Sequence, residues 1–200
     1  MDPTVSGYTA AMDAIALLTA DHNRVRGLFA RFKEADEADD VAAMRDLAAA
    51  VATELRVHTR IEEEVFYPEV RRGSDELEET VAEGIEEHHV VDVLLDEVEG
   101  LEPGAEDWVA KMTVMIENVE HHAGEEEDEL FPAVRRIFSA DDLAQQAERL
   151  EARKKELGAP TVADKEHLTV EELRSLAQEQ EIPGRSQMDR DELLATVAPG

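Results

Sequence analysis

An internal repeat constrains this chain more than any other feature of its sequence. Residues 58–72 (HTRIEEEVFYPEVRR) align without a gap with residues 122–136 (HAGEEEDELFPAVRR), and the Asp-His pair at residues 21–22 aligns with the Glu-His pair at residues 87–88. Each half of the repeat therefore supplies one histidine and then a His-x-x-x-Glu motif. Such a repeat predicts two similar helical hairpins that face each other across a pseudo-twofold axis.

Apolar residues recur at helical spacing along most of the chain, and no stretch alternates as a strand does. The sequence predicts an all-α fold: an antiparallel up-down four-helix bundle with a small C-terminal helix–extended–helix module. The bundle with its fifth helix is expected over residues 10–157, a linker over 158–167 and the module over 168–198. Helices are predicted over residues 10–37, 41–72, 75–99, 106–138 and 140–157, then over 169–180 and 188–197, with capping boxes at Ser139 and Thr169.

Composition limits the chemistry that this bundle can carry. The chain has no cysteine, which excludes disulfides, thiol catalysis and iron–sulfur clusters. Any metal must be bound by His, carboxylate, Tyr or water, a ligand set that suits iron, manganese or zinc. The 49 acidic and 20 basic residues give a net charge of −29, which argues against a nucleic-acid backbone or an anionic membrane as a partner.

Helix phase places one histidine of each long helix on the apolar face that forms the core. These inward residues are His22, His58, His88 and His122. The neighbouring His89 and His121 fall on outward faces. A lone buried histidine is usually a core residue with satisfied hydrogen bonds, but one histidine from every helix is hard to satisfy in that way.

Two glutamates share those faces, because Glu62 and Glu126 each follow a histidine by four residues. A buried carboxylate is costly unless it is paired or bound to a metal. The repeat therefore predicts two metal ions, each held by two imidazoles and both bridged by the two glutamates. The predicted ligands are His22, His58, Glu62, His88, His122 and Glu126.

With these motifs in order over about residues 13–157, the chain resembles the hemerythrin-like proteins of the HHE cation-binding family. The resemblance rests on Asp21-His22, His58-x-x-x-Glu62 with Phe66-Tyr67-Pro68, Glu87-His88, and His122-x-x-x-Glu126 with Leu130-Phe131-Pro132. It implies a four-helix bundle with two non-haem iron ions, bridged by an oxo or hydroxo group, that meet O2 or an oxygen-derived species.

The chain departs from the pattern of the oxygen-carrying hemerythrins in two places. Their third helix supplies His-x-x-x-His, whereas the second position here is Asp92, and their fourth-helix carboxylate follows its histidine by five residues instead of four. Asp92 is expected on the inward face. It either ligates the iron that His88 and His122 hold, or it pairs with Arg26, the residue that it matches in the repeat. Either way, that iron has one imidazole fewer than in the oxygen carriers.

This difference favours turnover over reversible oxygen storage, because an anionic ligand stabilises ferric iron and a missing ligand opens a coordination position. The leading hypothesis is a di-iron protein that binds O2 or an oxygen-derived species and reacts with peroxide, in a catalase-like or protective role. The alternative is a module that binds, senses or stores O2, NO or iron without turnover. A bundle that uses zinc or manganese structurally is a third interpretation.

The C-terminal residues resemble the N-terminal, SAP-like domain of transcription termination factor Rho, through the segments 168–173, 182–186 and 191–194. In that family the module can contact nucleic acid. Here the residues from Pro160 onward include four basic and nine acidic side chains, which argues against backbone binding and favours docking onto the bundle or a protein partner. The N-terminal residues lack the basic and apolar pattern of a signal peptide, so a cytoplasmic location without a membrane partner is expected.

Overall fold

A computed structural model of the chain describes residues 13–159 and 170–197, and over these residues it contains helices and no strands. The predicted all-α class is therefore confirmed. Residues 10–12, the capping box at Thr169 and most of the predicted linker lie outside the described residues. The elements are α1 (Ala14–Glu37), α2 (Val41–Ile61), η1 (Glu62–Phe66), α3 (Tyr67–Gly73), η2 (Asp75–Leu77), α4 (Glu78–Glu99), α5 (Glu106–Glu125), η3 (Glu126–Leu130), α6 (Phe131–Ile137), α7 (Ala140–Glu156), α8 (Val170–Glu179) and α9 (Arg190–Thr196).

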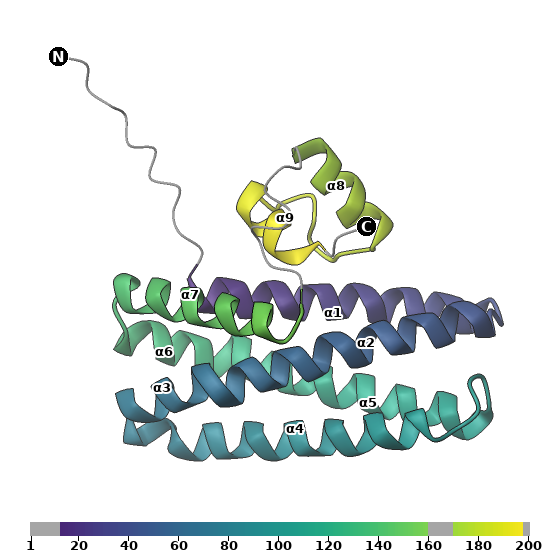
Figure 1. Cartoon of the computed structure of the whole chain (residues 1–200), viewed down its shortest axis with the longest axis horizontal. Coiled ribbons are helices and arrows are strands. Elements are labelled where there is room, and N and C mark those ends of the chain that lie inside the picture. Colours follow the sequence, from purple (N-terminus) through teal and green to yellow (C-terminus); the bar gives the residue numbers. More distant parts are fainter. Residues whose placement is uncertain (1–12, 160–169, 198–200) are drawn as a thin grey trace.

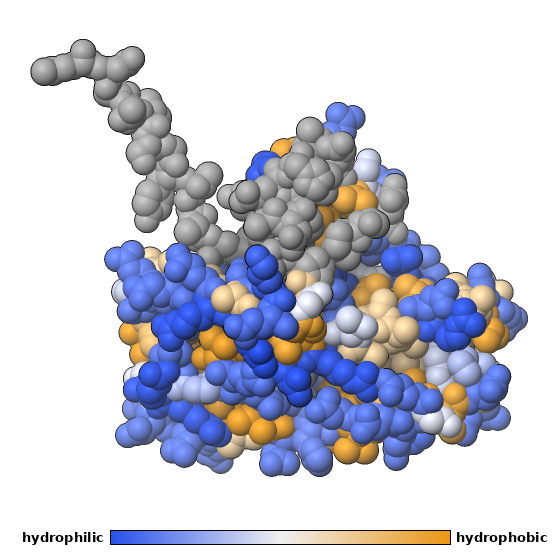
Figure 2. Space-filling model, in the orientation of Figure 1, coloured by the Kyte–Doolittle hydropathy of each residue, from blue (hydrophilic) through white to orange (hydrophobic). Residues whose placement is uncertain are grey.

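Four long helices lie side by side as a bundle, with α3 and α6 continuing the lines of α2 and α5 (Figure 1). Short connections join α1 to α2 and α4 to α5, and these two pairs make extensive contacts. The fifth helix, α7, packs against α1, α2 and η1, while α9 contacts α1. Hydrophilic residues cover most of the visible bundle surface, and hydrophobic residues show in the seams between helices (Figure 2). No helix in the described parts of the chain is both long and apolar enough to cross a membrane.

Side-chain caps fix where several helices begin. Asp13 and Asp40 accept hydrogen bonds from backbone N–H groups three residues on, and Ser139 forms the predicted capping box with Asp142 at the start of α7. The last helix begins at Arg190 rather than near residue 188. The cause is a second reciprocal cap, in which the Glu192 N–H donates to Asp189 and the Asp189 N–H donates to Glu192.

Residues 41–73 and 106–137 are helical, close to the predicted bounds, but neither segment is an α-helix throughout. Each contains a five-residue π-helical turn, η1 or η3, that begins at a glutamate of the repeat and ends just before the residue preceding a proline. Pro68 and Pro132 have no N–H, and their rings clash with the carbonyl four residues back in a regular helix. The wider turn accommodates the proline, and hydrogen bonds five residues apart replace the regular pattern, from Tyr67 N–H to Glu62 and from Phe131 N–H to Glu126.

The bundle core consists of two hydrophobic clusters, and the repeated histidines lie in the layer between them. One cluster contains Val25, Leu55, Val91 and Val119, which follow or precede the inward histidines by about one turn. The other contains Leu18, Ile61, Val81 and Leu130 on the opposite side of that layer. Polar ligating groups in the middle of the bundle are thus sealed by apolar packing at both ends.

The C-terminal residues have a small core of their own that rests on α1. The core is formed by Leu173, Ala177, Ile182, Leu193, Leu194 and Val197. The buried Arg24 of α1 donates from Nε to the Thr196 carbonyl at 2.8 Å. Three residues on, a Cβ at Gly27 would stand only 2.6 Å from the Gln180 carbonyl oxygen, so the absence of a side chain at this position allows the close approach.

A buried ion pair fastens α7 to α1. Lys154 and Asp21 are both about 3% exposed, and Lys154 Nζ donates to both carboxylate oxygens, at 2.5 and 2.7 Å. Burial opposes ionisation of Asp21, but the charge of Lys154, together with His58 and Arg24, outweighs burial and holds the pKa of this carboxyl well below its usual range. Removing only one member would leave a buried charge without its partner.

Lys154→Met is therefore expected to lower the free energy of unfolding by about 3 kcal/mol, measured by urea denaturation followed by circular dichroism. Lys155→Met is the matched control. It removes the same charge from an exposed position of the same helix and should change stability by less than about 0.5 kcal/mol. Equal stabilities of the two variants would contradict this account of α7.

Candidate metal centre

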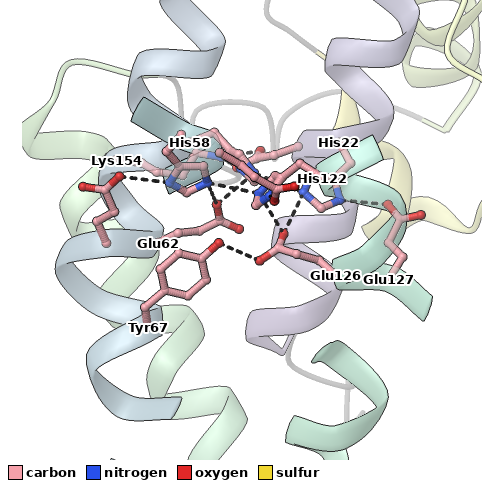
Figure 3. Close-up of polar contacts among 12 residues, drawn as sticks. His22, His58, Glu62, Tyr67, His122, Glu126, Glu127 and Lys154 are labelled. Atoms are coloured by element: carbon pink, nitrogen blue, oxygen red, sulfur yellow. Dashed lines mark hydrogen bonds and ion pairs between the residues drawn. The ribbon is translucent and has the colours of Figure 1, made fainter. Parts of the chain in front are cut away.

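Four histidines, one from each long helix, converge in the centre of the bundle. His22 of α1, His58 of α2, His88 of α4 and His122 of α5 are 1–6% exposed, whereas His89 and His121 are exposed, as the helix phase predicts. His22 Nε2 lies 3.1 Å from His58 Nε2, and His88 Nε2 lies 3.0 Å from His122 Nε2. Figure 3 shows the rings of His22, His58 and His122 directed at the same space as the Glu62 and Glu126 carboxylates.

Carboxylates behind the rings orient three of the four imidazoles. The Nδ1 atoms of His22, His88 and His122 lie 2.8, 2.9 and 2.7 Å from oxygens of Glu127, Glu63 and Glu87, respectively. A carboxylate accepts a hydrogen bond from Nδ1–H, so the lone pair of the neutral ring is on Nε2. His58 Nδ1 faces Asp21 at 3.7 Å, beyond hydrogen-bond distance.

Glu62 and Glu126 lie between the two histidine pairs. Glu62 Oε2 is 3.2 Å from His58 Nε2 and 3.3 Å from His88 Nε2, and Glu126 Oε2 is 3.3 Å from His22 Nε2 and 3.7 Å from His122 Nε2. Both oxygens of Glu62 and Oε2 of Glu126 are buried without a hydrogen-bond partner. Oxygens left in this way are costly unless a cation neutralises them.

The donor atoms fall into two overlapping groups that fit two cations. His22, His58, Glu62 and Glu126 form the first group, and Glu62, His88 and His122 form the second, with ligand atoms within 4.8 Å of one another. Facing lone pairs on imidazole nitrogens repel unless a positive charge lies between them. Imidazole with carboxylate suits iron, manganese or zinc. The six residues that the sequence singled out are thus brought together around space for two ions that share Glu62.

Protons compete with a metal for this centre. Burial lowers the pKa of His22, but hydrogen bonds to Glu126 and Glu127 outweigh burial and raise it to about 9. Burial, together with the charge of His22, lowers the pKa of His58 to about 4. Burial and the charge of Glu126 raise the pKa of Glu62 well above its usual range, while contacts with the histidines hold the pKa of Glu126 at about 2 against the effect of burial. Without a metal, His22 holds a proton at neutral pH.

The π-helical turns bring two aromatic residues to the centre. A turn that is one residue wider carries Tyr67 and Phe131 around to the face of Glu62 and Glu126. The Tyr67 hydroxyl donates to Glu126 Oε1 at 2.9 Å, and its ring stacks on His88. Phe131, at the matching position of the repeat, stacks on His22 and has no hydroxyl to donate.

Asp92 is not on the inward face, and that expectation was wrong. The buried positions of α4 around the centre are His88, Val91 and Leu95, spaced three and four residues apart, and Asp92 falls beside this stripe and is exposed. It belongs to neither cation group at the centre. Arg26, the other proposed partner of Asp92, donates instead to both oxygens of Glu127.

Sequence reasoning missed the carboxylates behind the imidazoles. Glu63 and Glu127 lie within acidic runs of the kind that usually face solvent, and Asp21 and Glu87 entered the sequence analysis only as neighbours of histidines. The repeat carried the signal, since Glu63 aligns with Glu127 and Asp21 with Glu87. A carboxylate that recurs beside a ligand in both halves of the repeat predicts a hydrogen-bond partner for a histidine on another helix.

An apolar cavity adjoins the centre. All four inward histidines line it, together with Val25, Phe29, Leu55, Val91, Val119 and Ala123 among others. About 20 Å³ of it is open to the centre of a water molecule, and a single water needs roughly 10–15 Å³ by this measure. The cavity therefore has room for one very small molecule beside the imidazoles.

Fold and site together define a helical-bundle protein that binds metal cations. Residues 13–134 match the Hemerythrin HHE cation binding domain, and the chain belongs to this family, whose members bind metal cations, usually iron. The chain is also similar to a DNA nickase from Nostoc sp. (strain PCC 7120), with 28% identity over 143 residues. That alignment covers 70% of this chain and 39% of the nickase, so the chain corresponds to well under half of that relative. No solved structure gives a significant match.

Glu62→Gln tests the shared carboxylate. The amide keeps the size of the side chain but removes the charge that both cations use, so the variant should hold fewer than two irons per chain. Iron is counted by atomic absorption after anaerobic loading and desalting. Glu64→Gln, an exposed change two residues on, should retain the wild-type count. Two irons in Glu62→Gln would contradict the bridging role.

Metal affinity should rise with pH, because a cation must displace the proton that His22 holds below its pKa of about 9. Between pH 6 and pH 8, Mn²⁺ affinity is expected to increase by up to about tenfold per pH unit for each proton displaced. Calorimetric titration in buffers of different ionisation enthalpy counts the released protons. An affinity independent of pH would show that the centre is already deprotonated.

Proposed function

We propose that the chain binds two non-haem iron ions and decomposes hydrogen peroxide in a catalase-like, protective role. The observation that carries this proposal is that the imidazole and carboxylate donors converge in the bundle, and that all four imidazoles also line a small, mostly apolar cavity. Bound iron would supply the change of oxidation state by which two H2O2 become two H2O and one O2.

The size of the cavity supports a small oxygen species as the reactant. Space for roughly one or two waters accepts peroxide or a diatomic gas and excludes an organic substrate. Most of its lining side chains are apolar. Val25 and Phe29 of α1 and Val119 of α5 line the cavity and belong to the same core cluster.

The ligand count supports turnover. Each ion would have two imidazoles and a share of Glu62, with Glu126 on the His22–His58 side, and the exposed position of Asp92 leaves the His88–His122 side one ligand short of the oxygen-carrying pattern. A coordination position without a protein ligand is where a small molecule can react. Tyr67 keeps a proton at its hydroxyl, 2.9 Å from Glu126, and thereby orients this carboxylate.

The second candidate function is binding of O2, NO or iron for sensing or storage without turnover. The enclosed cavity and the buried ligands serve that role equally well. A structural zinc or manganese centre is the third possibility, and it differs by the metal alone. The resemblance to the nickase does not extend to a proposal of DNA cleavage, because a net charge of −29 opposes contact with a phosphate backbone.

Iron-loaded protein is expected to release O2 from hydrogen peroxide, measured with an oxygen electrode. The same protein filled with zinc should release none, since zinc does not change oxidation state. Glu62→Gln should be slower by at least about tenfold and Glu64→Gln should match the wild type. A chain that holds two irons and leaves peroxide intact would overturn turnover in favour of the binding alternative.

A further inference from the structure

The two halves of the repeat differ behind one histidine of each half. Asp21 and Glu87 are equivalent in the repeat, and each lies behind a ligand of the neighbouring helix, His58 or His122. Asp21 also contacts the buried ammonium of Lys154, and α7 covers this side of the bundle. One half therefore has a positive charge from the protein itself beside the outer carboxylate.

The other half has metal-ligating side chains in place of that ammonium. Next to Glu87 lie His121 and Glu125, where the equivalent positions in the first half are the apolar Val57 and Ile61. One ligand atom from each of Glu87, His121 and Glu125 falls within 4.8 Å of the others. His121 and Glu125 have side chains 66% and 46% exposed, and Glu87 is 25% exposed. The group is open to solvent, and its two carboxylates and one imidazole are ligands that suit a divalent cation.

A small cavity leads from this group toward the buried centre. It is lined by the exposed Glu83 and Glu125 and by the buried Tyr67, Gly84 and Glu126, with Glu87 and His122 also on its wall. Gly84 opens it, because the equivalent residue in the first half is Leu18, whose buried side chain fills that space. A Cβ at Gly84 would come within 3.0 Å of the Tyr67 hydroxyl.

The inner wall of this cavity includes Glu126, whose Oε2 faces the His22 and His122 imidazoles of the centre. Glu126 is 4% exposed, and its Oε2 has no hydrogen-bond partner. Glu87 connects the two ends, since its Oε2 holds His122 Nδ1 at 2.7 Å while the same side chain belongs to the outer group. Carboxylates thus lie at both ends of the cavity, Glu125 at its outer end and Glu126 at its inner end, with Glu87 on the wall between them. Their negative charge attracts a divalent cation.

We propose that Glu87, His121 and Glu125 form a surface site for a divalent cation, and that iron reaches the buried centre from this site through the cavity at Gly84. The inference rests on the proposed function in that the centre takes up iron. The ligands are few and exposed, so the outer site binds weakly and exchanges its ion quickly. The buried centre, with more ligands and no competing water, retains the ion.

The test compares His121→Ala/Glu125→Gln with a matched control, His89→Ala/Glu86→Gln. Both remove one exposed histidine and one exposed carboxylate, so both change the overall charge equally, but His89 and Glu86 do not line the cavity. Metal-free protein is mixed anaerobically with limiting Co²⁺. The visible absorption that develops as Co²⁺ binds imidazole is followed over time and gives the loading rate. Final iron content after Fe²⁺ loading is measured separately.

The cavity variant should load about tenfold more slowly than the control and still reach the wild-type iron count. Equal loading rates would overturn the proposal. A lower final iron count would also overturn it, since the outer residues would then belong to the centre itself. Gly84→Ala, which narrows the cavity without changing charge, should likewise slow loading.

A direct count of Mn²⁺ ions by electron paramagnetic resonance keeps the outer site testable by itself. Wild type and control should each bind one more weakly held Mn²⁺ than His121→Ala/Glu125→Gln. If the wild type takes up no pair of irons, the proposed function fails, and the Mn²⁺ count still decides whether the outer site exists. No difference in the count would contradict the outer site.

Discussion

The close approach of four buried imidazoles and two buried carboxylates makes a positive charge at the centre of this bundle strongly favourable. Carboxylates behind His22, His88 and His122 hold protons on the outer nitrogens, which leaves the inner nitrogens as donors only 3.0–3.1 Å apart within each pair. Buried carboxylates between the pairs make this charge more favourable still. In the absence of a metal, protons supply the charge, as the raised pKa of His22 shows. A metal ion and a proton would therefore compete for the same imidazole nitrogens at the centre of the bundle.

The prolines of the repeat determine how the carboxylates reach this point. Pro68 and Pro132 force each helix to widen into a π-helical turn that starts at Glu62 or Glu126. The widening turns the following aromatic residue toward the centre, and the aromatic ring then stacks on a ligand histidine. Ligand, proline and aromatic residue therefore act as one local unit, and the repeat duplicates that unit in both halves.

The sequence was sufficient for the fold class and for the six residues that converge, because helix phase and the repeat both report on the core directly. It was insufficient where a side chain acts across helices. The acidic runs conceal Glu63 and Glu127, since charge alone does not distinguish a solvated face from a partner of a histidine. Asp92 was predicted on the inward face of its helix, four residues after His88. In the structure the buried face of α4 near the centre contains His88, Val91 and Leu95 and leaves Asp92 outside it. Lys154 lies in α7, outside the repeat, so no internal comparison pointed to it.

The pseudo-twofold axis relates the ligands but not their surroundings. On the α1–α2 side, Asp21 is neutralised by Lys154, and Arg24 extends the contact to the Thr196 carbonyl of α9 and to Glu54. On the α4–α5 side, Glu87 bonds directly to its histidine and is open to solvent. A carboxylate hydrogen-bonded to an imidazole makes that ring a stronger donor, so a cation bound on the side with Glu87 would meet stronger donors. Two chemically different positions thus arise from one repeated ligand set, because the fifth helix and the C-terminal residues cover only one of them.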